Sequence, residues 1–263
     1  MKRFEDRERV MSRFEEKVVI VTGAGSGIGE ATAQRFAREG AQVVLVGRTR
    51  EKLEKVAESL EGHGHVHVAD VADREAVEAL VRAVIERFGR LDVLVNNAGV
   101  VEGGRLHESN LDDWHKVMQI NVDGVVYASR AALPELLKTK GCIVNVSSVS
   151  GLGGDWGMSY YNASKGAVTN LTRAMALDYG AEGVRINAVC PSITRSDLTQ
   201  GITGNEALME KFADRLPLGR PAEAAEVGDV IVFLASGDAR FVNGVNLPVD
   251  GGLSASNGQP RMS

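Results

Sequence analysis

Cysteine and long apolar runs are scarce in this chain, and each scarcity excludes a class of protein. The two cysteines, Cys142 and Cys190, are too few for a disulfide framework and lack the close Cys/His spacing of a zinc site. We interpret both as small buried apolar residues in a reducing compartment. No apolar run approaches the roughly 20 residues that cross a bilayer, and the first residues mix acids with bases, unlike a signal peptide. We therefore expect a soluble, cytoplasmic protein.

An excess of positive charge is also missing. The formal net charge is −5, and the lysines and arginines are scattered along the chain. We therefore expect neither nucleic acid nor a membrane surface as a partner. No internal repeat, low-complexity segment or proline-rich linker divides the 263 residues, a length that one α/β domain can reach around a single large sheet.

Short β-branched runs alternate with amphipathic stretches along most of the chain. The seven runs cover residues 18–21, 42–46, 65–69, 91–95, 142–146, 184–189 and 245–249. The helical patterns between them include residues 30–39, 50–60, 74–88, 111–137 and 159–180. Right-handed crossovers would place these helices on both faces of a parallel sheet. The sequence thus predicts a Rossmann-type, doubly wound α/β fold with a seven-stranded parallel sheet.

Two segments depart from this alternation. Residues 1–13 carry dense charge without an apolar stripe, so we expect a flexible arm before a single domain at residues 14–263. The break between the sixth strand and the next helix is long, and it follows the carboxyl end of a strand. Because open α/β sheets bind ligands at that edge, we predict a lid at about residues 192–217.

A cluster of glycines directly follows the first predicted strand. It reads Thr22-Gly23-Ala24-Gly25-Ser26-Gly27-Ile28-Gly29 and leads into a helix. Glycines in this position permit a tight turn, let backbone N–H groups approach a pyrophosphate, and bring the positive end of the helix dipole to the phosphates. The segment therefore predicts dinucleotide binding.

The residues after the second predicted strand bear on the choice of dinucleotide. An NAD-binding protein usually presents an acid there to the adenosine ribose, whereas this chain has Gly47-Arg48-Thr49-Arg50. A guanidinium can donate several hydrogen bonds to a 2′-phosphate, so Arg48 favours NADP(H). NAD(H) stays open, because Arg48 can also point to solvent and Ser26 adds no second basic group.

The fifth predicted strand ends at Ser148, and a helix that begins near residue 159 carries Tyr161 and Lys165. Four residues apart on a helix, Tyr161 and Lys165 share one face. A close ammonium is expected to lower the pKa of the phenol, so that it can exchange protons near neutral pH. Reduction of a ketone needs such a proton and a second hydrogen-bond donor for the developing alkoxide, which Ser148 can supply.

Taken together, these motifs resemble the short-chain dehydrogenase/reductase family from about Phe14 to Leu253. The shared features are Gly-x3-Gly-x-Gly from Gly23, Asn96-Asn97-Ala98-Gly99, the spacing Ser148-x12-Tyr161-x3-Lys165, and Val249-Asp250-Gly251-Gly252. One departure follows the sixth strand, where Pro191-Ser192-Ile193-Thr194-Arg195-Ser196 stands in place of the family's Pro-Gly-x-Ile-x-Thr.

The resemblance implies an NAD(P)-dependent enzyme that interconverts ketones and secondary alcohols. It implies that Tyr161 is the general acid/base, that Asn121 extends a proton relay, and that Tyr161 and Lys165 lie at the nicotinamide ribose. Further cofactor contacts are implied at Asp70, Val71, Asn97, Ala98, Gly99, Pro191, Thr194 and Ser196. The family also implies a homo-oligomer, commonly a tetramer, built through two long helices and the last strand.

Two residues between Ser148 and Tyr161, Trp156 and Met158, are predicted to form part of the substrate-pocket wall. We expect no metal, although His63, His65 and His67 would share one face of a strand, because no carboxylate or cysteine joins them at ligand spacing. Two alternatives stay open. One is reduction of a 3-ketoacyl thioester on acyl carrier protein, and the other is a non-catalytic NADP(H) sensor or scaffold.

Overall fold

Seven parallel strands form one sheet at the centre of the computed structural model, which describes residues 12–259. They are β1 (Val18–Thr22), β2 (Gln42–Gly47), β3 (Gly64–Val68), β4 (Val93–Asn96), β5 (Cys142–Val146), β6 (Arg185–Pro191) and β7 (Asn246–Val249). Their order, β3-β2-β1-β4-β5-β6-β7, confirms the predicted doubly wound fold. The order reverses between β1 and β4, and ligands bind outside the carboxyl ends of the strands at such a point.

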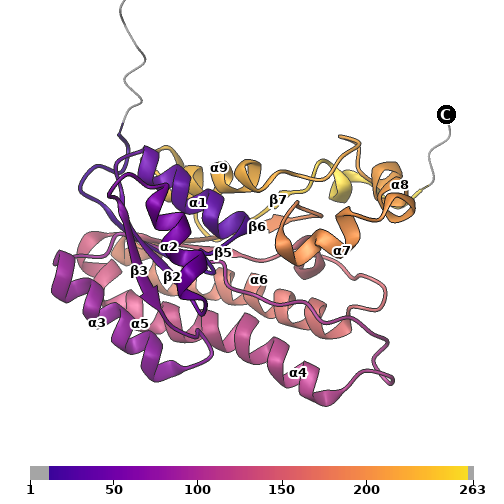
Figure 1. The fold of residues 1–263 in the computed structure, drawn as a ribbon, viewed down its shortest axis with the longest axis horizontal. Helices are drawn as coiled ribbons and strands as arrows, with labels where there is room; N and C mark the ends of the chain where they lie inside the picture. The colour runs from indigo at the N-terminus through magenta and orange to yellow at the C-terminus, as the bar shows by residue number, and fades with distance from the viewer. Residues whose placement is uncertain (1–11, 260–263) are drawn as a thin grey trace, which may run out of the picture.

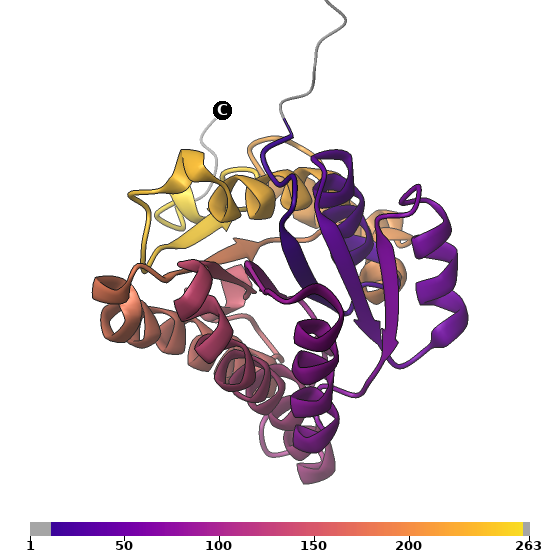
Figure 2. The same cartoon turned by 90° about the vertical axis from the view of Figure 1, so that its left-hand side faces the viewer.

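Helices cover both faces of the sheet (Figure 1 and Figure 2). One face packs against α1 (Gly27–Arg38), α2 (Arg50–Glu58) and α9 (Ala224–Ala235). The other packs against α3 (Arg74–Phe88), α5 (Gly124–Thr139) and α6 (Ser159–Tyr179). The remaining helices are α4 (Leu111–Met118), α7 (Gln200–Thr203) and α8 (Glu206–Arg215). Within residues 12–259, no helix is long and apolar enough to span a membrane.

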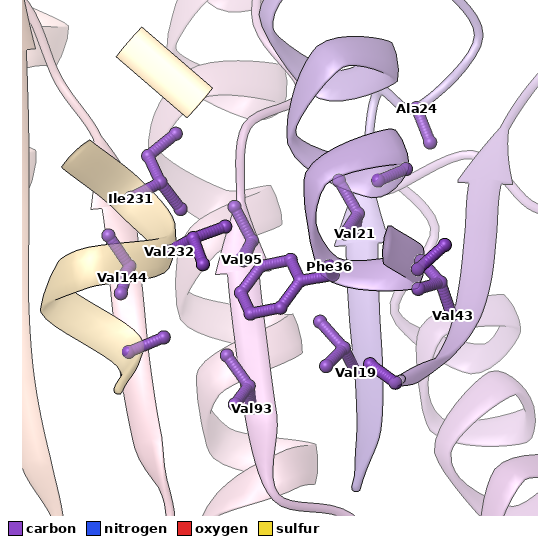
Figure 3. Packing of buried hydrophobic residues seen from close by; sticks show 14 of the residues in the cluster. Val19, Val21, Ala24, Phe36, Val43, Val93, Val95, Val144, Ile231 and Val232 are labelled. Atoms are coloured by element: carbon purple, nitrogen blue, oxygen red, sulfur yellow. The ribbon is translucent and has the colours of Figure 1, made fainter. Parts of the chain in front are cut away.

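The β-branched runs become strands because both of their faces are buried. Figure 3 shows valines of β1, β4 and β5 beneath Phe36 of α1 and the Ile231–Val232 pair of α9. Each of these side chains is at most 2% exposed. Burying an aliphatic or aromatic side chain of this size contributes about 1.5–3 kcal/mol, so this layer fixes the sheet beneath the loops that carry the motifs.

The predicted helix over residues 111–137 is not one continuous α-helix. It consists of α4, a π-helical turn at Gln119–Asp123, and α5. A π-turn inserts one extra residue per turn and is common at functional sites, and it cannot be distinguished from an α-helix by apolar periodicity alone. Asn121 lies in this turn.

The predicted lid contains secondary structure. After β6 the chain forms a 3-10 turn at Asp197–Thr199, followed by α7 and α8, which lie beside the carboxyl edge of the sheet (Figure 1). Of the predicted flexible arm, residues 1–11 lie outside the described part. Arg13 is held in place, because its Nη2 donates to Glu39 Oε1 at 2.6 Å, and the next residue, Phe14, is buried against Phe36.

Candidate active site

The loop after β1 is shaped by glycine and tied to the end of β4. Gly23 adopts φ +65°, and a Cβ added at Gly29 would lie 2.2 Å from the Gly23 carbonyl oxygen. Asn97 Nδ2 donates to the carbonyl oxygens of Thr22 and Gly23 at 3.0 and 3.1 Å. The hydroxyl of Thr22 accepts the backbone N–H groups of Asn97 and Ala98. Gly27 and Ile28 at the start of α1 line a cleft, and we call this loop and helix start the cradle.

The π-turn brings Asn121 to the loop after β4. Its Oδ1 accepts the N–H of Val100 at 2.8 Å, and its Nδ2 donates to the Val100 carbonyl at 2.9 Å and to Ser164 Oγ at 3.1 Å. A Cβ added at Gly99 would lie 3.2 Å from Asn121 Oδ1 and 3.6 Å from Lys165 Nζ. Asn121 therefore joins the loop after β4, the π-turn and α6, and Gly99 lies close to both Asn121 and Lys165.

Three of the four residues predicted to be catalytic, Ser148, Tyr161 and Lys165, line one cleft, and Asn121 lies behind it. Ser148 follows β5 and is buried, while Tyr161 and Lys165 share a face of the first turns of α6. Lys165 Nζ donates to the Val146 carbonyl at 2.9 Å and lies 5.6 Å from the centre of the Tyr161 ring. Ser148, Tyr161 and Lys165 all line a cleft of about 460 Å³ together with the glycine loop.

Burial controls the ionisation of this pair. Burial is the largest influence on the Tyr161 phenol, whose pKa is raised to about 12. A hydrogen bond with the Ser148 hydroxyl lowers this pKa, and the negative charge of Asp155 raises it. Burial also lowers the pKa of Lys165 to about 8. The expected lowering of the tyrosine pKa is therefore absent, because desolvation of the phenolate is the largest influence on this group. At neutral pH the Tyr161 phenol carries its proton.

The segment after β6, for which we predicted a lid, supplies part of the cleft. Pro191, Thr194 and Ser196, predicted as cofactor contacts, line the cleft, and so do Asp197, Leu198 and Thr199, which sequence patterns did not reveal. Lys52 of α2 also lines the cleft, and its Nζ donates to Asp197 at 2.8 Å. This ion pair links α2 to the lid across the glycine loop, where Ser196 packs against Gly27. The one feature of the sequence that could have indicated a role for Lys52 in the cleft is its position in the first turn of α2, directly after β2.

The predicted ribose and adenine positions lie beyond this part of the cleft. Arg48 is exposed after β2, with its Nη1 4.0 Å from Asp70 Oδ2. Asp70 Oδ1 accepts the N–H of Ala72 at 3.0 Å, which closes the turn after β3. Val71 is buried against Gly124, the first residue of α5. Arg48 and Asp70 thus lie side by side at the carboxyl edge of the sheet.

Neither residue predicted to form the pocket wall lines the cleft. Trp156 is 97% exposed, because the segment from Leu152 to Gly157 runs over the surface. Met158 instead packs against Gly103 and pairs with Gly104 in an isolated β-bridge. The spacing between Ser148 and Tyr161 indicated that this segment lies near the site but could not predict which way its side chains point.

Comparisons with known proteins agree with this geometry. The family model described as enoyl-(acyl carrier protein) reductase matches residues 23–254. A meso-2,3-butanediol dehydrogenase from Serratia marcescens is 55% identical over 251 residues, which cover 95% of this chain and 99% of that protein. A 3-oxoacyl-(acyl-carrier-protein) reductase from Thermotoga maritima is 39% identical, over 92% of this chain and 99% of that protein.

Solved structures show the same likeness. A gluconate 5-dehydrogenase from Burkholderia cenocepacia, in complex with NADP and tartrate, aligns with a TM-score of 0.89 at 32% identity. The alignment covers 94% of this chain and 98% of that protein.

The chain belongs to the short-chain dehydrogenase/reductase family. It is an oxidoreductase that acts on CH–OH groups and interconverts carbonyls and alcohols with a nicotinamide cofactor. The residues present fit that cofactor, because a side chain at Gly29 would collide with the backbone of the cradle at the start of α1. Its substrate is a small molecule.

Proposed function

We propose that this enzyme uses NADP(H) to interconvert a short vicinal hydroxyketone or diketone with the corresponding alcohol, with Tyr161 as the general acid/base. The observation that carries the proposal is the convergence of Ser148, Tyr161 and Lys165 on the cleft that also contains the glycine loop. Asn121 completes the group from the π-turn, within contact of Gly99 and Ser164.

The chemistry of reduction follows from these positions. A nicotinamide cofactor held beside the glycine loop would supply the hydride for the carbonyl carbon, or accept one from the alcohol carbon in the reverse direction. The carbonyl oxygen accepts a hydrogen bond from Ser148 and then the proton of the Tyr161 hydroxyl, which yields the alcohol and a phenolate. Lys165 stabilises that phenolate by its charge. Asn121 ties Ser164 of α6 to the Val100 backbone and so supports the helix that carries Tyr161 and Lys165.

The preference for NADP(H) rests on Arg48. Within residues 12–259 it forms an ion pair with Asp70 alone, at a long distance of 4.0 Å, so the guanidinium can donate to a 2′-phosphate. Gly47 and Thr49 on either side of Arg48 carry no charge that would repel the phosphate. Lys52 also lies at the glycine loop, but its charge is paired with Asp197, so the preference depends on Arg48.

The substrate class is suggested by the relative named for meso-2,3-butanediol, which is 55% identical to this chain. Hydroxyl side chains gather in the cleft around the reacting position, including Ser148, Ser192 and Thr194. A short substrate with oxygens on adjacent carbons can form hydrogen bonds with such a lining. The acyl-carrier alternative is weakened because Arg195 is paired with Glu223 at 3.0 Å.

The proposal is tested by following nicotinamide absorbance with diacetyl, acetoin, meso-2,3-butanediol and acetoacetyl thioesters, with NADP(H) and NAD(H) in parallel. We expect turnover of the four-carbon diketone and diol with NADP(H). The Tyr161→Phe variant should lose turnover but bind NADPH nearly normally, since only the transferable proton is removed. Near-normal turnover by this variant would refute the mechanism, and turnover of thioesters alone would favour the acyl-carrier alternative.

We further propose that the enzyme is a homotetramer. Exposed apolar side chains lie on the outer helices and before β7, among them Val126, Leu177, Phe233 and Phe241. A shallow groove between α5 and α6 is lined by Leu133, Leu137, Leu171 and Met175. Exposed apolar surface of this kind marks protein interfaces. Light scattering should give four times the mass of the chain, and a monomeric mass would contradict the proposal.

A further inference from the structure

A chain of hydrogen bonds leads from Ser148 out of the cleft to a carboxylate on the surface. Ser148 Oγ donates to Ser150 Oγ at 3.1 Å, and the backbone N–H of Ser150 donates back to Ser148 Oγ at 3.1 Å. Ser150 Oγ in turn donates to Asp155 Oδ2. Ser148 and Ser150 are each 7% exposed, whereas Asp155 lies on the exposed segment between Leu152 and Gly157.

Asp155 is also attached to the helix that carries Tyr161. Its backbone carbonyl accepts from Nδ2 of Asn162 at 3.3 Å, and Asn162 is the residue next to Tyr161 in the first turn of α6. The side chain of Asp155 thus reaches the turn of Ser148, and its main chain reaches the turn of Tyr161. One residue spans the two elements whose hydroxyls must meet the same substrate oxygen.

The carboxylate of Asp155 determines which group donates in each hydrogen bond of this series. An ionised carboxylate only accepts hydrogen bonds, so the Ser150 hydroxyl must donate to Asp155. The Ser150 hydroxyl has one proton, so its oxygen can only accept a hydrogen bond from Ser148. The oxygen of Ser148 accepts one bond, from the backbone N–H of Ser150, and this bond remains when the Ser148 proton turns from Ser150 Oγ to a carbonyl oxygen that enters the cleft. A hydroxyl held in one rotamer by neighbouring hydrogen bonds is the arrangement that transition-state stabilisation requires.

We propose that Asp155 is a positioning residue for this reaction, which acts through Ser150 to hold the Ser148 hydroxyl in place opposite Tyr161. This inference rests on the proposed roles of Ser148 and Tyr161. It assigns a function in catalysis to an exposed carboxylate that touches neither the reacting atoms nor the cofactor cradle.

The test is a double-mutant cycle on the full-length protein, with diacetyl and NADPH at saturation. Asp155→Ala keeps the main-chain bond to Asn162 and removes the bond to Ser150 together with the carboxylate charge that raises the pKa of Tyr161. Because this bond is one hydrogen bond to a charged group, we expect Asp155→Ala and Ser150→Ala each to lower kcat about tenfold. In the Ser148→Ala background, Asp155→Ala should change kcat less than about twofold, since the hydroxyl that it positions is already gone.

Two further variants separate positioning from structure and charge. Asp155→Asn retains an oxygen that can accept from Ser150, so it should restore kcat to within about threefold of the wild type. Asp112→Asn removes the same charge from an exposed position on α4 and should leave kcat unchanged. The Kd for NADPH, measured by fluorescence, should change less than about twofold in all of these variants.

An equal loss of kcat from Asp155→Ala with and without Ser148, or no loss in either background, would overturn the inference. Failure of the proposed function has a different signature, because Ser148→Ala and Tyr161→Phe would then turn over normally.

Discussion

The charge of Arg48 should decide which nicotinamide dinucleotide this enzyme uses, and Arg48→Asp reverses that charge at one position. The guanidinium is 65% exposed and lies 4.0 Å from Asp70. A hydrogen bond to a charged group contributes about 1.5–3 kcal/mol, and we take the lower end because solvent screens an exposed pair. A carboxylate placed near the 2′-phosphate adds repulsion of about 1 kcal/mol.

The expected loss is therefore about 2.5 kcal/mol for NADPH, which corresponds to roughly 70-fold in kcat/KM. NADH should lose much less, because its 2′-hydroxyl can donate a hydrogen bond to the new carboxylate. The measurement is the ratio of kcat/KM for NADPH to that for NADH, with diacetyl at saturation and at one fixed ionic strength, since salt screens exposed charges.

The matched control is Arg50→Asp, which makes the same charge change two residues further on. Arg50 is also exposed, but its Nη1 lies 3.5 Å from Glu54 along α2. We expect this variant to change the cofactor ratio by less than about threefold. If Arg48→Asp reduces kcat/KM equally for both cofactors, or if the two variants behave alike, Arg48 does not contact the 2′-phosphate and the argument for NADP(H) fails.

Three further predictions concern the cradle, the lysine and the lid. Gly29→Ala should lower the free energy of unfolding by about 1–3 kcal/mol in denaturant titrations and abolish NADPH binding, because its Cβ would collide with the Gly23 carbonyl. Gly237→Ala, whose added Cβ meets open space, should be close to neutral, and equal losses in the two variants would contradict the steric argument. The kcat for diacetyl reduction should fall above about pH 8, where Lys165 loses its proton while Tyr161, with a pKa of about 12, keeps its own. A profile that stays flat to about pH 10 would exclude a requirement for the charged lysine. Lys52→Ala should speed NADPH release about threefold in stopped-flow fluorescence without changing the melting temperature, because the exposed pair with Asp197 contributes under about 1 kcal/mol. Asp197→Asn should have the same effect, and a slower release in either variant would show that the pair does not hold the lid.

Features that are determined by residues close together in the sequence could be predicted from the sequence alone. The β-branched runs defined all seven strands, because buried parallel strands need side chains that fill both faces of the sheet. The glycine loop was recognisable because its backbone conformation excludes other residues, as the contacts of Gly23 and Gly29 show. The pairing of Tyr161 with Lys165 followed from the period of the helix.

The tertiary structure decided what depends on contacts between distant segments. The burial that raises the pKa of Tyr161 comes from the packing around α6, so a rule for a nearby lysine predicted the wrong direction. The Lys52–Asp197 pair joins residues 145 positions apart, and the bonds from Ser148 to Asp155 depend on how an irregular turn folds back. Apolar periodicity in the sequence indicates which face of a helix or strand is buried. It does not indicate which way a loop side chain such as Trp156 points, nor that a π-turn forms at Asn121.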